Sequence, residues 1–265
     1  VEAGKYTTED GFLWKASYGA NLSPSTMTDN NMGVEVAALN PSESETYMYD
    51  LKTKKKKLTE AREQLKSFVN DMNVLKRGSA ELKAYLESRV DVDLFLRAYA
   101  VNVAVGMWDD YWNNKNNFYI YFNSSDKDNY KFFFIPFDYD NTLGTSSNCG
   151  EQSDSGRHDP LNWGNTNDSP LIGKILKFSD YRKIYVDALN ELCDPANDLF
   201  HYSSSIARIN GWHNMIRNYV DNDTEEDCEI KDRPASWGNI YDYRILDAES
   251  SMNFFKVKAQ SIPKN

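Results

Sequence analysis

Hydrophobic positions recur with the spacing of an amphipathic helix from residue 58 onward. At intervals of three or four residues stand Leu58, Ala61, Leu65, Phe68 and Met72. Such a stripe occupies one side of a helix, and it predicts that this side packs against the rest of the protein.

Two further helical segments follow toward the middle of the chain. A short helix is expected over Ser79–Glu87. The next begins at Asp91 or Asp93, since either side chain can cap it, and it ends at Gly106. This third helix is apolar on nearly all sides, so we expect it to be buried at the centre of the domain.

The pattern then changes to short runs that are rich in aromatic residues. Phe118–Phe122 and Tyr130–Phe137 have the composition of strands, and the polar residues between them predict a hairpin loop. An earlier extended segment is expected at Phe12–Ala16. The second run leads directly into an Asp-x-Asp turn formed by Asp138 and Asp140.

Helices are predicted again after a polar segment, Thr145–Asp168, which we expect to be a functional loop. Ser169 and Ser179 each precede a helical pattern and are predicted to cap it. Two more helical segments are expected over residues 203–219 and 247–262. The predicted fold class is therefore α+β, mostly helical, with one β-hairpin.

Composition restricts the possible functions. The chain has 265 residues, of which 40% are hydrophobic and 14% aromatic, so it can bury a sizeable core. Its net charge of −10 argues against a nucleic-acid binder, which needs clustered Lys and Arg. No apolar run approaches the ~20 residues of a membrane span. The three cysteines, Cys149, Cys193 and Cys228, lack the spacing of a metal or redox site.

The polar segments on either side of the hairpin carry the candidate chemistry. Phosphoryl transfer needs a carboxylate to take the proton of the acceptor hydroxyl and oxygen ligands to hold Mg²⁺ against the phosphates. Before the hairpin stand Asp109 and Asp110, which are followed by Asn114 and Asn117. Asp138 comes directly after it. Protein kinases place a base Asp, a metal-binding Asn and a metal-binding Asp in the same order.

The segment Trp108–Gly144 reads WDDYWNNKNNFYIYFN…YKFFFIPFDYDNTLG, and it closely resembles the spore coat protein H (CotH) kinase family of atypical, secretion-associated kinases. A looser similarity extends to FLWKA, YDLKTK, VDVDLFLRAYAVNVAVG, SPLIGKIL and SDYRKIYVDAL. The resemblance therefore spans most of the chain.

The resemblance implies a protein-kinase-like fold that binds ATP and Mg²⁺. It implies phosphorylation of Ser or Thr on a partner protein, or on the chain itself, in a spore-coat, cell-surface or extracellular setting. Asp109 matches the catalytic base of the family. Asn117 matches the Asn before the first hairpin strand, and Asp138 and Asp140 match the metal-binding turn. Position alone leaves Asp110 open as an alternative to Asp109, and Asn114 as an alternative to Asn117.

The small β-lobe of such a fold is largely absent from the sequence. No Gly-rich phosphate loop precedes Phe12, so residues 1–56 are expected to be the remainder of an N-terminal lobe and linker. Residues 57–265 are then the helical catalytic lobe. Because the chain starts at Val1 without an initiator Met, we expect its natural beginning to lie upstream, and nucleotide binding to be weak without those strands. Lys52 is predicted to contact the phosphates, with Lys15 as the alternative.

Two other functions fit parts of the sequence. In a haloacid-dehalogenase-like phosphatase, Asp138 would be the nucleophile and Asp140 the acid/base. That fold needs a parallel sheet, which the helical sequence after Gly144 does not predict. The second alternative is a non-catalytic pseudokinase or surface-protein binding module, with Trp108–Trp112 as its recognition loop.

Overall fold

The computed structural model describes residues 10–38, 42, 44–146, 154–197, 200–224, 231–234 and 238–262. The fold is α+β, as predicted, and the chain divides into two compact units. The first consists of Val1–Tyr99, Asp109–Asp138 and Gly164–Tyr185, and the second of Ala100–Trp108, Tyr139–Trp163 and Val186–Asn265. Among the described residues, no helix is long and apolar enough to cross a membrane.

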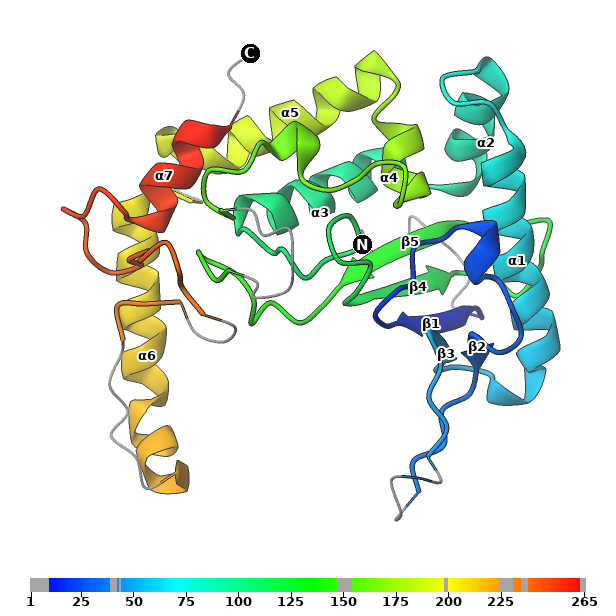
Figure 1. The fold of residues 1–265 in the computed structure, drawn as a ribbon, viewed down its shortest axis with the longest axis horizontal. Helices are drawn as coiled ribbons and strands as arrows, with labels where there is room; N and C mark the ends of the chain where they lie inside the picture. Colours follow the sequence, from blue (N-terminus) through cyan, green and yellow to red (C-terminus); the bar gives the residue numbers. More distant parts are fainter. Residues whose placement is uncertain are drawn as a thin grey trace. The chain divides into compact units, whose positions relative to one another are not determined.

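A sheet of five strands, counted over the described residues, forms the centre of the first unit in the order β2-β3-β1-β4-β5 (Figure 1). Its strands are β1 (Phe12–Ala16), β2 (Met32–Gly33), β3 (Tyr49–Leu51), β4 (Phe118–Phe122) and β5 (Phe132–Pro136). All neighbours are antiparallel except β2 and β3. The strand at residues 12–16 and the hairpin are confirmed. That residues 1–56 are the remainder of a larger lobe stays a prediction.

The sheet has one fully buried face and one partly exposed face. The second face carries Lys15 and Asp50 beside Leu13 and Ile135, and we call it the polar face. On β1, Phe12 and Trp14 are fully buried, whereas Lys15 points the other way and is half-buried. β4 shows the same alternation. The fully buried face packs on α1 (Leu58–Val74), where the ring of Phe68 stacks on that of Phe132 with centroids 4.6 Å apart. This alternation is typical of a sheet with one covered face.

The helices of the first unit begin where capping residues allow. The stripe predicted on α1 is buried from Ala61 to Met72. Helix α2 (Ala80–Arg89) starts after Ser79, whose hydroxyl accepts the Leu82 N–H. Asp91, not Asp93, caps α3 (Val92–Ala104) by accepting the Leu94 N–H at 3.2 Å.

Two predictions about the helices are wrong. Leu94 and Val101 of α3 are 39% and 38% exposed, so this helix is not buried on all sides. Ser169 does not cap α4 (Pro170–Ile175). It is fully buried, and its hydroxyl instead donates to the backbone oxygens of Tyr111 and Trp112. A buried backbone carbonyl needs a hydrogen-bond donor. The Ser169 hydroxyl supplies this donor instead of capping α4.

The second unit contains α6 (Tyr202–Thr224) and α7 (Phe254–Ser261). Helices α3 and α5 (Ser179–Cys193) each begin in the first unit and end in the second. Helix α6 is longer than predicted and α7 is shorter. Asn253 sets the start of α7 by accepting the Lys256 N–H. The core of this unit is an aromatic cluster made of Phe200, Tyr243, Phe254, Phe255 and Val257.

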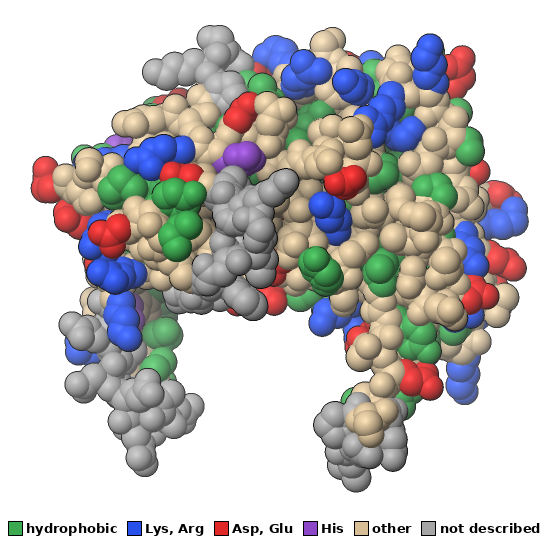
Figure 2. Space-filling view, viewed as in Figure 1, with side chains coloured by type: hydrophobic (Ala, Val, Ile, Leu, Met, Phe, Trp, Pro, Cys, Tyr) green, Lys and Arg blue, Asp and Glu red, His purple; other side chains and the backbone are tan. Residues whose placement is uncertain are grey.

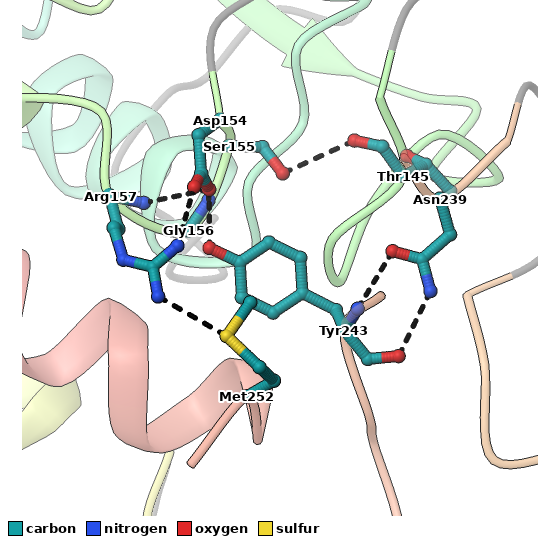
Figure 3. Close-up of polar contacts among 8 residues, drawn as sticks. All are labelled: Thr145, Asp154, Ser155, Gly156, Arg157, Asn239, Tyr243 and Met252. Atoms are coloured by element: carbon teal, nitrogen blue, oxygen red, sulfur yellow. Dashed lines mark hydrogen bonds and ion pairs between the residues drawn. The ribbon is translucent and has the colours of Figure 1, made fainter. Parts of the chain in front are cut away.

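Tyr243 ties this core to the segment that follows the Asp-x-Asp turn (Figure 3). Its hydroxyl donates to the carboxylate of Asp154, which also forms an ion pair of 2.8 Å with Arg157. Burial, with the nearby Asp154 charge, raises the pKa of Tyr243 far above its usual range. The phenol is therefore neutral and acts as a donor. Gly144 and Gly156 leave room for it, since a Cβ on either would collide with the Tyr243 side chain.

Candidate functional site

The loop between α3 and β4 surrounds Asp109 with asparagine side chains. The amide nitrogens of Asn114, Asn116 and Asn117 all donate to its carboxylate, and the bond from Asn117 measures 2.9 Å. A carboxylate only accepts, so these bonds fix which atom of each amide faces it. Asp109 is half-buried and is held in one orientation by three donors.

The neighbouring Asp110 is in a different environment. Its side chain is fully buried, and one oxygen accepts the Tyr99 hydroxyl at 2.5 Å while the other accepts the Asn113 N–H at 2.8 Å. Tyr99 in turn accepts the Trp112 N–H. Burial, and then the Asp110 charge, raise the pKa of Tyr99 well above its usual value. The hydrogen bonds of Asp110 thus hold the loop together, whereas the Asp109 carboxylate is partly exposed to solvent.

Asn117 connects this loop to the turn after the hairpin. Its side chain donates to the carboxylate and to the backbone oxygen of Asp109, and its own backbone oxygen accepts the Phe137 N–H at 3.1 Å. Phe137 is bonded directly to Asp138. Asn117 therefore holds the polar loop next to the start of the Asp-x-Asp turn. In the sequence, Asp109 and Asp138 are 29 positions apart (138 − 109).

Comparison with known proteins places the chain in a family. A family model described as CotH kinase protein matches residues 17–245. The chain belongs to the CotH kinase family. The resemblance found in the sequence is thereby confirmed over most of its length. Searches of curated proteins and of solved structures found no match.

The sheet of this CotH family member does not fit the dehalogenase alternative. Strand β5, which leads to Asp138, is the last strand of the sheet and is antiparallel to β4. The phosphorylated Asp of a dehalogenase follows a strand inside a parallel sheet. A nucleophilic role for Asp138 is therefore inconsistent with this topology.

Two lysines lie on the polar face of the sheet. Lys52 forms ion pairs with Asp50 and, at 3.2 Å, with Glu35. Burial opposes the charge on Lys52, but these two carboxylates outweigh it and raise the pKa of the amine. Lys15 is the cross-strand partner of Asp50 on β1, and its Nζ lies 5.4 Å from the centre of the Phe137 ring. Of the two, Lys15 is the one next to the residue that precedes Asp138.

The side chains near the loop supply oxygen donors suited to a hard cation. Asp138 offers a carboxylate, and the amide oxygen of Asn117 is the atom of that group not directed at Asp109. Mg²⁺ prefers such oxygens and usually takes only one or two carboxylates from a protein. In the described ranges, no three His, Cys, Asp or Glu side chains gather as a metal site. Asp140 belongs to the second unit, and its part in metal binding stays a prediction.

The sequence alone did not indicate the side chain that forms a hydrogen bond with Asp110. Tyr99 lies on the buried side of a helix that is otherwise almost wholly apolar. A buried Tyr hydroxyl usually has a hydrogen-bond partner, and this rule was the available signal. Without the tertiary contact, however, nothing in the sequence says which of the two neighbouring carboxylates it meets.

Proposed function

We propose that this CotH family member is an atypical protein kinase that transfers the γ-phosphoryl group of ATP to Ser or Thr of a protein. The observation that carries the proposal is the double contact of Asn117, which binds the Asp109 carboxylate and the Phe137 amide. It links the loop of a candidate base, Asp109, to the residue that precedes a candidate metal ligand, Asp138, and this supports the arrangement that phosphoryl transfer requires.

Each residue has a distinct task in this proposal. Asp109 takes the proton of the attacking hydroxyl, and the asparagine amides hold its carboxylate in place. The hydroxyl oxygen then forms a bond to the γ-phosphorus as the bond to the bridging oxygen breaks, and ADP leaves. Asp138 and Asn117 are suited to hold Mg²⁺, which supplies charge neutralisation at the phosphates. Lys15 adds positive charge on the same side of the sheet.

The test is transfer of labelled γ-phosphate from Mg-ATP to casein and to the chain itself. Asp109→Asn is expected to reduce transfer by about 10²–10⁴-fold, the usual effect of losing a general base, and to keep Mg-ATP binding. Asp138→Ala is expected to reduce both transfer and Mg²⁺-dependent nucleotide binding. Asp126→Asn, at an exposed position in the hairpin loop, is the matched control and should behave like wild type.

The outcomes separate the kinase from the alternatives. Full transfer by Asp138→Ala would remove this residue from the mechanism. Binding of Mg-ATP by the wild type without any transfer would favour a pseudokinase. A spore-coat, cell-surface or extracellular location, and a substrate protein found there, are part of the same proposal and rest on the family alone.

A further inference from the structure

The second half of α6 carries hydrophobic side chains that face solvent. Trp212, Met215, Ile216 and Tyr219 are 59%, 67%, 50% and 75% exposed. Their spacing of three, one and three residues puts them on one side of the helix. Figure 2 shows such side chains, in green, on α6 at the lower left. We call these four residues the α6 stripe.

The stripe continues a face that is covered in the first half of the helix. There, Tyr202 and Ile209 pack against the aromatic cluster of the second unit, and Ser205 is buried. Ile209, Trp212, Ile216 and Tyr219 keep the alternating three- and four-residue spacing of a helix that pairs with another helix. The same kind of contact is therefore expected over the exposed half.

The order of residue types in the stripe is the same in both directions. The run from Trp212 to Tyr219 consists of an aromatic residue, two polar residues, two aliphatic residues, two polar residues and a second aromatic residue. A two-fold axis between Met215 and Ile216 would set Trp212 of one chain opposite Tyr219 of the other. Such self-complementarity is what a symmetric dimer interface requires.

The area available suits a weak dimer. Large side chains of this kind carry roughly 150–250 Å² each, so the exposed part of the stripe is on the order of 500 Å². Two copies would bury about 1,000 Å², the lower limit for a specific interface. We propose that α6 pairs antiparallel with α6 of a second copy of this chain, and that the dimer dissociates in the micromolar range. This inference is independent of the proposed kinase activity.

Sedimentation velocity of the 265-residue chain, measured from low to several hundred micromolar, tests the pairing. The wild type should pass from monomer to dimer. Ile216→Asp puts a charge at the axis and should raise the dissociation constant at least about 30-fold, as for a central interface residue. Val74→Asp, which replaces an 80% exposed apolar residue on α1, is the control and should dimerise like wild type.

A second set of variants tests the orientation. In an antiparallel pair, Trp212→Lys of one copy faces Tyr219→Glu of the other, so the double variant should dimerise more tightly than either single variant. A wild type that stays monomeric throughout, or an Ile216→Asp variant that still dimerises, would overturn the proposal. A double variant that dimerises no better than either single variant would overturn the antiparallel arrangement.

Discussion

Asp109 and Asp110 are adjacent in the sequence but have opposite surroundings. Asp110→Ala leaves the buried Tyr99 hydroxyl and the Asn113 amide without their acceptor, so the free energy of unfolding should fall by about 2–4 kcal/mol. Asp109→Ala exposes its amide partners to water and should cost less than about 1 kcal/mol, yet abolish transfer. Urea unfolding and a phosphotransfer assay on both variants check this, and the reverse pattern would exchange the roles of the two residues.

The two lysines of the polar sheet face should also differ. Lys52→Met leaves Asp50, whose side chain is only 1% exposed, without its cation, so stability should fall by about 1–3 kcal/mol. The lower part of that range is favoured because Lys52 itself is 31% exposed and partly screened by solvent.

Lys15 has a different expected effect. Lys15→Met removes a charge that is stacked near Phe137 but is not needed to neutralise a buried acid. Stability should change little, while the apparent affinity for Mg-ATP should fall several-fold. Isothermal titration of both variants separates the two lysines. A larger loss of nucleotide affinity with Lys52→Met would return the phosphate contact to that residue.

At the level of elements, two glycines with left-handed backbones allow a matched comparison. Gly144 has φ +103°, and a Cβ there would lie 2.6 Å from Cβ of Tyr243. Gly78 has φ +79°, but nothing lies within 4 Å of the corresponding point. Gly78→Ala should therefore cost only the conformational penalty of about 1–2 kcal/mol.

Gly144→Ala should cost about 1–3 kcal/mol more, because Tyr243 must also move. Thermal unfolding of the two variants gives the difference directly. Equal losses would mean that the Tyr243 side chain shifts freely. The hydrogen bond from its hydroxyl to Asp154 argues against that freedom, and Asn239 also accepts the Tyr243 backbone N–H.

The helices and strands that the sequence predicts are those with a regular hydrophobic pattern of their own. The stripe on α1 and the alternation on β4 follow from local period, and both are confirmed. Strands β2 and β3 have two and three residues and exist only because distant segments pair with them, so no local pattern indicates them. For the candidate site, the sequence left Asp109 and Asp110 as alternatives. Their different surroundings depend on Tyr99, whose partner is decided by tertiary packing.

For the whole molecule, one buried lysine predicts how stability depends on pH. Lys258 is fully buried, donates to the backbone oxygen of Ser155 and lies over the ring of Trp163. Burial lowers its pKa to about 7 from an ordinary value of 10.5. Between these pH values the unfolded chain holds a proton that the folded chain does not, so the lysine destabilises the fold increasingly as pH falls, and by a constant amount below pH 7.

Lys258→Met lacks this effect. The free energy of unfolding of the variant minus that of the wild type should therefore shrink by about 1.4 kcal/mol for each pH unit from about 7.5 to 9.5. Urea unfolding at several pH values in that window measures it. A difference that stays constant with pH would mean that the amine is charged in the folded protein.

The backbone conformation at the candidate site restricts which residue types can occupy it. Asn117 and Asp138 both have left-handed conformations, with φ 56° and 64°. Besides glycine, Asn and Asp are the residues that adopt this geometry most readily. The proposed chemistry and the backbone conformation thus favour the same side chains at both positions. When the chemistry is no longer under selection, glycine is the replacement that preserves the fold, so relatives that have lost transfer should carry it at one position or the other.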